Sequence, residues 1–262
     1  MEYRQARDQL AKALRPAAGE EAFLEAGFLL DALTRGLRRP LTEEETELLF
    51  SQAERRQKGE PLQYILGEWE FMGLPMKVRP GVLIPRPETE LLCETALREL
   101  PRGAKVLDLC CGTGCIGIAM SRLGGAQVTF CDISEDALTV ARENAALNGV
   151  EGEFLQGDFF APLKGRTFDG ILCNPPYLTG EEMETLQREL TYEPALALYG
   201  GGDGLDFYRR LQKEAPLHLK PGGRLYMEIG CTQGQAVQGL FPGSRILQDL
   251  SGQDRVVCRR ME

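Results

Sequence analysis

Four consecutive residues, Asn174-Pro175-Pro176-Tyr177, are of the types that can hold an NH2 group. The two prolines fix the backbone φ and remove two N–H donors, so the turn keeps carbonyl oxygens that are free to accept hydrogen bonds. Asn174 adds a side-chain carbonyl, and two such acceptors can take both hydrogens of one NH2 group. The ring of Tyr177 can stack on the planar group that carries it. The tetrapeptide therefore predicts a binding site for an amide or an aromatic amine.

Such a site has a chemical use, because the nitrogen of an amide or an aromatic amine is a poor nucleophile with a delocalised lone pair. Acceptors placed out of the amide plane favour the pyramidal nitrogen that attacks a methyl group, which stabilises the transition state through positioned dipoles. The attack then needs no strong base. A simple Asx-Pro turn is the alternative. The predicted strand at 170–173 favours the functional interpretation, because ligands bind at strand ends near the centre of a doubly wound sheet.

A second segment has the composition of a cofactor loop. Residues 106–117 begin with an apolar run and then contain Gly112, Gly114 and Gly117, with the spacing G-x-G-x-x-G. Asp132 follows Gly112 by 20 residues, at the end of the next predicted strand, where a carboxylate can hold two ribose hydroxyls. Both features suit any adenosine-bearing cofactor, and a purely structural turn is a further possibility.

Charge distinguishes the candidate cofactors. A dinucleotide places its anionic pyrophosphate at the helix N-terminus beside the loop. S-adenosylmethionine has no phosphate and carries a sulfonium and an ammonium. A rim containing Asp108, Asp132 and Asp158 attracts these cations and repels pyrophosphate, so the sequence favours S-adenosylmethionine, with no metal.

Strands and helices alternate from residue 88 onward and position both segments. We expect strands at 105–110, 127–131, 152–156, 169–173 and 223–229, and helices at 88–100, 115–123, 135–148 and 205–219. This alternation predicts an α/β fold with a mostly parallel sheet covered on both faces. Residues 244–248 and 255–259 are expected to pair at an edge of that sheet.

The N-terminal part of the sequence shows no strand–helix alternation. Residues 1–62 show helical periodicity, and Thr42 with Glu45 resembles a capping box. Short runs at 63–66 and 75–78, separated by glycines, predict extended segments of a hairpin-like linker at 63–84. The predicted domains are thus a helical domain at 1–62, that linker, and a catalytic domain at 85–262.

Composition limits the function further. The 262 residues carry a formal charge of −9 and a single histidine, so a His-rich metal site is excluded and a hydrolase would depend on His218, which we expect in a surface or capping role. The acidic balance disfavours stable nucleic-acid binding. Eight cysteines form no CxxC pair, no apolar run approaches 18 residues and the N-terminus does not resemble a signal peptide. We therefore expect a cytoplasmic protein with reduced thiols, most of them buried, and no membrane association.

Taken together, these motifs resemble the HemK/PrmC family of peptide chain release factor glutamine methyltransferases. The similarity extends over essentially the whole chain. The motifs that carry it are Gln63–Gly67, Leu83–Glu90, the Asp108–Gly114 loop, Asp132, Gly157-Asp158, Asn174–Tyr177, Glu193–Leu198, Gly201–Leu205 and Leu219–Gly223. Asn-Pro-Pro-Tyr alone is shared with amine methyltransferases of DNA and RNA, and Pro85–Glu90 adds specificity.

The resemblance implies a Rossmann-like class I methyltransferase fold and methylation of the glutamine amide in a Gly-Gly-Gln motif. It also implies that the helical domain at 1–62 is the substrate-recognition domain. The implied partners are peptide chain release factors, and we expect the chain to be a monomer. Catalysis would rest on Asn174, Pro175 and Tyr177, with Pro176 beside them at the substrate. The implied cofactor-binding residues are Asp108, Cys110, Cys111, Gly112, Thr113, Gly114, Asp132, Ile133, Asp158, Phe159 and Asn174. Many relatives have glycine at the position of Cys110, which we expect in an ordinary region of φ.

Several alternatives stay open. A nucleic-acid amine (adenine) methyltransferase would usually need a basic channel, whereas residues 1–70 hold 10 basic and 14 acidic residues. A related enzyme that methylates a glutamine of a ribosomal protein is a second alternative, and these motifs do little to exclude it. A dinucleotide-dependent oxidoreductase or an adenosine-binding module leaves Asn174–Tyr177 unexplained. Finally, Arg86, Glu88 and Thr89 either border the cofactor or substrate entrance or simply cap the helix that begins there.

Overall fold

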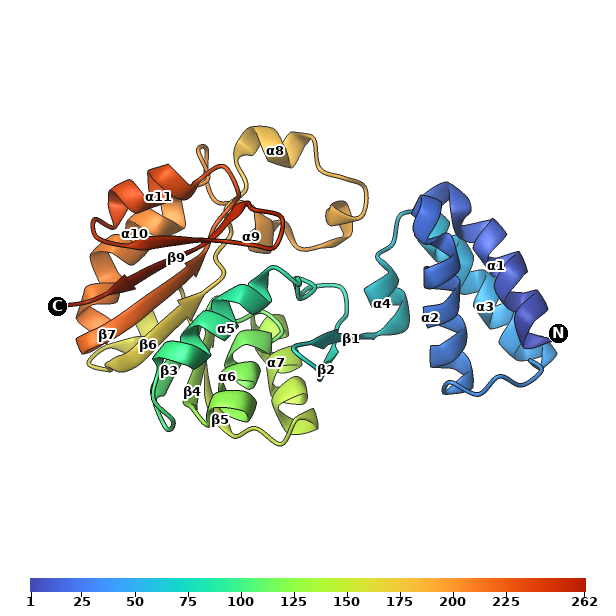
Figure 1. Cartoon of the computed structure of the whole chain (residues 1–262), viewed down its shortest axis with the longest axis horizontal. Coiled ribbons are helices and arrows are strands. Elements are labelled where there is room, and N and C mark those ends of the chain that lie inside the picture. The colour runs from blue at the N-terminus through green and yellow to red at the C-terminus, as the bar shows by residue number, and fades with distance from the viewer. The chain divides into compact units, whose positions relative to one another are not determined.

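The computed structural model describes residues 1–262 and divides them into two compact units. Unit 1 comprises Met1–Glu68 together with Gln187–Tyr192, and unit 2 comprises the remainder, Trp69–Leu186 and Glu193–Glu262. No helix is long and apolar enough to cross a membrane. Figure 1 shows the elements in chain order.

Unit 1 is helical. Its main elements are α1 (Tyr3–Ala18), α2 (Ala22–Thr34), α3 (Glu43–Gln57) and α4 (Leu62–Leu66). Their apolar faces meet in a small core that includes the fully buried Leu10, Leu29 and Leu49. The capping box predicted at Thr42 is present, because the Thr42 hydroxyl accepts the N–H of Glu45 and the Glu45 carboxylate accepts the N–H of Thr42.

A buried ion pair lies inside unit 1. Arg56, at the end of α3, donates two hydrogen bonds of 2.9 Å to the carboxylate of Glu25 on α2, and both side chains are buried. The same guanidinium lies 2.7 Å from a carboxylate oxygen of Glu189. Tyr192 donates its hydroxyl to the carbonyl oxygen of Lys58 at 2.9 Å. Residues 187–192 are therefore bound to unit 1 although they are distant from it in sequence.

Unit 2 begins with a short hairpin and continues as a seven-stranded sheet with the order β5-β4-β3-β6-β7-β9-β8. The first five strands in that order are parallel, and β9 and β8 close the sheet as an antiparallel pair. The strands are β1 (Glu68–Phe71), β2 (Leu74–Lys77), β3 (Lys105–Leu109), β4 (Gln127–Asp132), β5 (Gly152–Gln156), β6 (Phe168–Cys173), β7 (Leu219–Glu228), β8 (Arg245–Gln248) and β9 (Asp254–Arg260).

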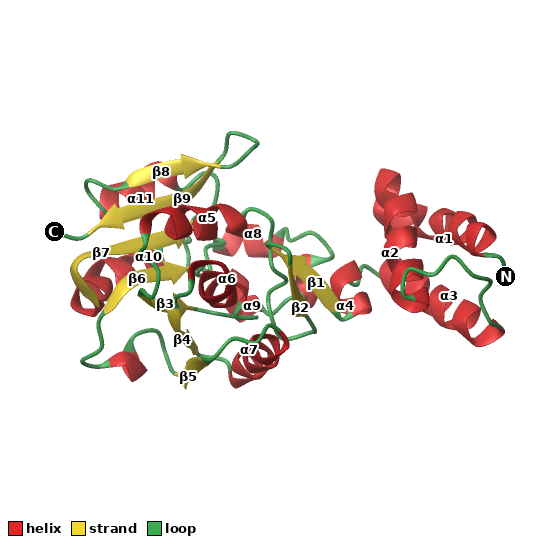
Figure 2. Cartoon of the chain, turned by 60° about the horizontal axis from the view of Figure 1, so that its bottom comes forward, coloured by secondary structure: helices red, strands yellow, loops and turns green.

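Helices cover both faces of this sheet, as Figure 2 shows. One face is covered by α5 (Thr89–Glu99), α6 (Cys115–Gly124) and α7 (Glu135–Leu147), and the other by α10 (Asp206–Glu214) and α11 (Gly234–Leu240). Two short helices, α8 (Gly180–Glu184) and α9 (Ala195–Leu198), follow β6. The α/β fold with a mostly parallel sheet is therefore as predicted.

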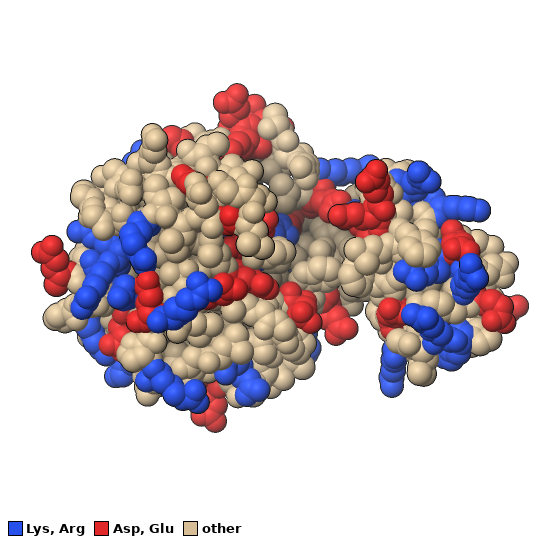
Figure 3. All heavy atoms as spheres, in the orientation of Figure 1, with Lys and Arg blue, Asp and Glu red and all other residues tan.

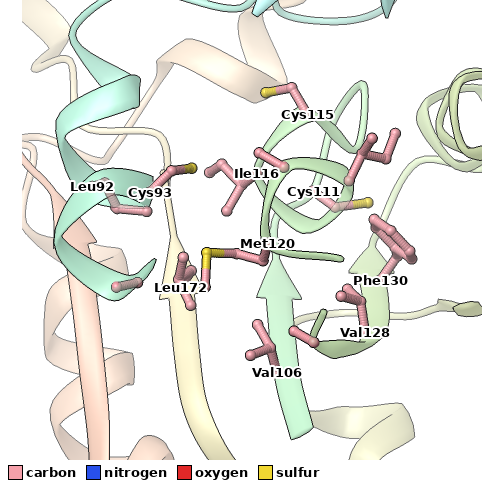
Figure 4. Close-up of a cluster of buried hydrophobic side chains, with 14 of the residues drawn as sticks. Leu92, Cys93, Val106, Cys111, Cys115, Ile116, Met120, Val128, Phe130 and Leu172 are labelled. Carbon is pink, nitrogen blue, oxygen red and sulfur yellow. The ribbon is translucent and has the colours of Figure 1, made fainter. Parts of the chain in front are cut away.

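The core on the α5–α6 face fixes the loop that follows β3. Figure 4 shows Leu92 and Cys93 of α5, Ile116 and Met120 of α6 and Phe130 of β4 packed together. Gly117 lets α6 approach the sheet closely, because a Cβ on it would collide with the Phe130 ring. The third glycine of the predicted loop thus has a packing function.

Two expectations about this architecture were wrong. Residues 63–66 are helical, not extended, because α4 buries Tyr64 and Ile65 and ends at Gly67 in a left-handed conformation. The arms of the hairpin are consequently β1 and β2. His218 is not at the surface: it is buried, its ring stacks on Phe160 at 4.7 Å and its Nδ1 lies 3.0 Å from the carbonyl oxygen of Arg166. A histidine held in this way has a structural role.

Most of the thiols are buried, as expected. All eight cysteines are free, and only Cys231 is exposed. Cys110 is half-buried and the other six are buried.

Candidate active site

A cavity opens at the carboxyl ends of β3, β4 and β6, where a doubly wound sheet binds its ligands. Its empty volume, the open mouth included, is about 1070 Å³. Its walls are mostly apolar, with a few polar groups, as in typical small-molecule sites. The predicted site residues that line it are Cys110, Cys111, Gly112, Thr113, Asp132, Ile133, Asp158, Phe159, Asn174 and Pro176.

The loop after β3 turns sharply at its first residue. Cys110 has φ +59°, so the expectation of an ordinary φ was wrong. The left-handed conformation costs a non-glycine residue roughly 1–2 kcal/mol. Around it the chain is held, since the N–H of Cys111 donates to the carbonyl oxygen of Cys131 at 3.1 Å. Gly112 also has a positive φ, and a Cβ there would meet nothing within 4 Å, so its backbone faces open space where a ligand can approach.

Asp132 ends β4 at the cavity wall. One carboxylate oxygen accepts the N–H of Gly112 and the other the N–H of Ser134, both at 2.9 Å. Burial raises the pKa of Asp132, although the backbone donors oppose this shift. Ile133 is exposed and lines the cavity beside it. The carboxylate therefore ties two loops together at the cavity wall.

Asp158 and Phe159 form another part of the wall. Asp158 is paired with Arg210 of α10 at 2.8 Å, and the guanidinium of Arg210 lies 4.6 Å from the centre of the Phe159 ring. Phe159 has φ +58°, and its carbonyl oxygen accepts the thiol of Cys131 at 3.2 Å. Cys110 and Phe159 thus both line the cavity in left-handed conformations.

Asp108 does not belong to the acidic rim, contrary to expectation. It is fully buried below the loop and does not line the cavity. One carboxyl oxygen accepts the N–H of Gly117 at 2.8 Å, whereas the other has no partner. Burial raises the pKa of Asp108 to about 8, so the group is mostly uncharged at neutral pH. Gly114 is likewise absent from the cavity wall and supports the turn from below, against Ala141.

The tetrapeptide after β6 places Asn174 at the cavity. The Nδ2 of Asn174 donates to the hydroxyl oxygen of Thr89 at 3.3 Å, and the Thr89 hydroxyl lies 2.6 Å from a carboxylate oxygen of Glu228. The Oδ1 of Asn174 makes no hydrogen bond within the chain. Pro176 lines the cavity, whereas Pro175 and Tyr177 do not. The carbonyl oxygen of Tyr177 accepts Nε2 of Gln233 at 2.9 Å, which holds the turn in place.

The segment before α5 borders the cavity. Arg86 and Thr89 line it, and no side chain caps the start of α5, so these two residues border the cavity and do not cap the helix. Glu88 precedes the helix and is absent from the cavity wall. The carboxylate of Glu193 binds the guanidinium of Arg86 and accepts the N–H of Ile84 at 3.0 Å.

Sequence reasoning assigned no role to two of these buried carboxylates. Glu193 belongs to a quoted motif, but its partners lie more than 100 residues away. Glu228 lies between the apolar residues Met227 and Ile229 at the end of a buried strand. A single acidic residue in such an apolar run predicts a buried carboxylate with a polar partner.

The charges on the cavity wall fit S-adenosylmethionine better than a dinucleotide. Arg86 is the only basic residue among those lining the cavity, and Glu193 neutralises it. No free cation is left there for a pyrophosphate, and Asp132 would repel one. The same wall accepts a sulfonium and an ammonium, and its apolar part suits an adenine ring.

Comparisons with known proteins agree with this geometry. The family model of the PrmC N-terminal domain matches residues 3–67, and that of the methyltransferase small domain matches residues 87–205. A release factor glutamine methyltransferase of Geobacter sulfurreducens is 43% identical over 92% of this chain and 90% of its own length. One from Moorella thermoacetica is 43% identical over 97% of each chain.

The chain belongs to the release factor glutamine methyltransferase family. The predicted class I methyltransferase fold and the predicted enzyme class, an S-adenosylmethionine-dependent methyltransferase, are thereby confirmed. A solved methyltransferase from Pyrococcus furiosus has the same fold, with a TM-score of 0.56 over 84% of this chain and 98% of its own, at 17% identity. A 16S rRNA methyltransferase of T. thermophilus, solved with AdoMet and guanosine, also has a TM-score of 0.56, over 74% of this chain and 50% of its own, at 20% identity. Members of the glutamine methyltransferase family thus share this fold with enzymes that act on other substrates.

Proposed function

We propose that this chain transfers a methyl group from S-adenosylmethionine to the side-chain amide nitrogen of the glutamine in the Gly-Gly-Gln motif of peptide chain release factors. The observation that carries the proposal is the state of Asn174. Its NH2 is committed to Thr89, so its free Oδ1 is the atom available to an incoming amide at the cavity. The relatives named release factor glutamine methyltransferase supply the substrate class.

Bound S-adenosylmethionine would supply an electrophilic methyl group on its sulfonium. The residues of this chain then bind and orient. Asn174 Oδ1 and the carbonyl oxygen of Pro175 accept the two amide hydrogens and favour a pyramidal nitrogen. Tyr177, which does not line the cavity, supports the turn through the bond from Gln233 to its carbonyl oxygen. The methylated nitrogen loses its extra proton to water or to the same acceptors, so a strong base is not required.

The proposed cofactor contacts follow the cavity wall. Cys110–Thr113 would surround the methionine part, Asp132 would hold the ribose hydroxyls, and Ile133 with Asp158 and Phe159 would flank the adenine. Asp108 and Gly114 support the loop from below rather than touch the cofactor.

Unit 1 is proposed to recognise the protein substrate. On the face shown in Figure 3, basic and acidic side chains are interspersed on both units. Residues 1–70 hold 10 basic and 14 acidic residues, a balance that favours a protein substrate over a nucleic-acid one, which would need a continuous basic channel. We expect the chain to act as a monomer in the cytoplasm, where its substrate would be found.

The decisive experiment incubates the purified chain with S-adenosylmethionine labelled in the methyl group and with a release factor or its variant in which the motif glutamine is alanine. We expect label only in the release factor that carries the glutamine. Equal labelling of both proteins would show that the motif glutamine is not the residue that is methylated. Labelling of a ribosomal protein or of DNA, with the release factor unlabelled, supports the corresponding alternative enzyme.

A further inference from the structure

We infer that Thr89 and Glu228 are positioning residues for the methyl transfer: through the Thr89 hydroxyl, the Glu228 carboxylate sets which end of the Asn174 amide faces the substrate. The inference deepens the proposed function and rests on it for the identity of the substrate. It adds two residues to the site that touch neither the reacting nitrogen nor the methyl group.

The contacts form a chain of two hydrogen bonds across three elements. Glu228 ends β7, Thr89 begins α5 and Asn174 follows β6. The Thr89 hydroxyl lies 2.6 Å from the Glu228 carboxylate and 3.3 Å from Asn174 Nδ2. Glu228 and Thr89 are buried, with exposed fractions of 1% and 2%, so water cannot readily replace either bond.

The chemistry of the three groups fixes the direction of this chain. An ionised carboxylate only accepts hydrogen bonds, so Thr89 must give its single hydroxyl hydrogen to Glu228. The hydroxyl oxygen can then only accept, and the Asn174 atom that faces it must be the NH2. The carbonyl end of Asn174 is therefore turned to the substrate side. An amide rotated by 180° would present its NH2 to the NH2 of the substrate glutamine, and two donors cannot bind each other.

Protonation of Glu228 removes this constraint. A protonated carboxyl can donate to the Thr89 oxygen, and Thr89 can then donate to Asn174 Oδ1, which reverses the amide. Burial raises the pKa of Glu228 to about 7, and the bond from Thr89 opposes that shift. The active orientation is thus the one present above this pKa, and it is lost as the pH falls.

The other groups around Glu228 do not account for such a titration. Arg255 on β9 and Arg86 before α5 lower the pKa of Glu228, and Glu88 raises it. The remaining neighbours are thiols and phenols whose own pKa values are raised by burial, so they stay neutral near pH 7; they are Cys93, Cys115, Tyr177 and Tyr208. Tyr208 also donates its hydroxyl to the backbone carbonyl of Glu228 at 2.9 Å, which fixes the strand end.

Three threonine variants test the hydroxyl. T89V removes it at nearly constant shape, T89S restores it, and T95V removes the buried hydroxyl of Thr95 on the same helix, which donates to Leu91 and does not line the cavity. We expect T89V to lower kcat roughly 10- to 100-fold, T89S to recover most of it and T95V to match the wild type. Calorimetry should give S-adenosylmethionine Kd values within about threefold of each other. Unchanged kcat in T89V, or a loss that lies only in cofactor affinity, overturns the inference.

The carboxylate is tested by its pH profile. We expect kcat of the wild type to fall below about pH 7, and E228Q, in which residue 228 cannot titrate, to be slower and to lack this acid limb. An acid limb that persists in E228Q overturns the assignment to Glu228, and so does a wild-type profile without one.

A spectroscopic readout separates this inference from the proposed function. In chain labelled with 15N at asparagine, the side-chain NH2 signals of Asn174, assigned by their loss in N174D, should shift with an apparent pKa near 7 in the wild type and not in T89V or E228Q. If the signals titrate but the release factor is not methylated, the proposed substrate is wrong and the positioning role stands. If the release factor is methylated but the signals do not titrate, the positioning role is wrong.

Discussion

Asp132, at the end of β4, accepts the backbone N–H of Gly112, in the loop after β3, at 2.9 Å. The two residues come from neighbouring strands, 20 positions apart, so one carboxylate fixes the shape of the loop and still faces the cavity. One side chain thus sets the loop geometry and is also placed to contact a ligand in the cavity.

Replacing Asp132 should therefore weaken cofactor binding strongly. We expect D132A to raise the Kd for S-adenosylmethionine at least about tenfold. The substitution removes a hydrogen bond between a charged carboxylate and the ligand, and also the bond that holds the Gly112 loop. The measurement is isothermal titration calorimetry. D136A, which removes an exposed acid four residues further on, is the matched control and should bind like the wild type. An unchanged Kd in D132A would place the ribose elsewhere.

Asn174 should act on turnover and not on cofactor affinity. We expect N174A to lower kcat roughly 10²–10³-fold, the size seen when one transition-state hydrogen bond is removed. The Kd for S-adenosylmethionine should stay close to that of the wild type. Calorimetry that showed lost cofactor affinity with normal turnover at saturation would assign Asn174 to cofactor binding.

The buried ion pair of unit 1 predicts a large difference between two neighbouring arginines. R56M leaves the carboxylate of Glu25 buried without its partner and should lower the free energy of unfolding by about 3 kcal/mol or more. R55M breaks only a half-exposed pair with Glu60 and should cost less than about 1 kcal/mol. Urea unfolding followed by circular dichroism measures both. Equal effects would show that the burial of Arg56 is not what stabilises the unit.

Asp108 predicts a pH dependence of stability. Its pKa is about 8 in the folded chain and its ordinary value is 3.8, so the folded state holds a proton that the unfolded state has lost. The stability that this proton contributes is complete below about pH 4 and is lost as the pH rises towards 8. D108N cannot titrate, so its unfolding free energy should fall less between pH 5 and pH 8 than that of the wild type. Glu228 leaves a residual slope of the same sign, and identical slopes in both proteins would contradict the prediction.

The thiols should differ in reactivity according to burial. Cys231 is exposed and should be alkylated first, so C231S should remove most of the rapid labelling. Cys110 is half-buried at the cavity wall and should react more slowly and be protected by S-adenosylmethionine. Burial raises the pKa values of Cys115 and Cys131 to about 12, so these two should stay unlabelled at neutral pH. Mass spectrometry of alkylated peptides, with and without cofactor, checks each site.

Local patterns predicted the sheet well, because periodicity and strand–helix alternation are properties of short segments. They also predicted two helix starts, that of α6 at Cys115 and that of α3 with its capping box at Thr42. Positions where tertiary contacts override local preference were predicted poorly. Residues 63–66 look extended, yet their apolar side chains are buried on a helix, and Cys110 accepts a strained φ because the loop around it is fixed by neighbouring strands.

The same distinction holds for the site. Asn174 and Asp132 could be found from sequence because each directly follows or ends a recognisable strand. Asp108 looks equally acidic in sequence, but only the structure shows that its carboxyl points under the loop to Gly117. The contribution of Glu228 depends on a contact with Thr89, 139 residues away, which no local pattern encodes.

The chain leaves unit 2 at Gln187, contributes the six residues Gln187–Tyr192 to unit 1 and returns to unit 2 at Glu193. No single cut in the polypeptide can therefore separate the two units intact. Removal of residues 1–68 would leave Glu189 and Tyr192 without their partners Arg56 and Lys58. Protease nicking between Gln187 and Tyr192 should accordingly weaken the contacts of Glu189 and Tyr192 with Arg56 and Lys58.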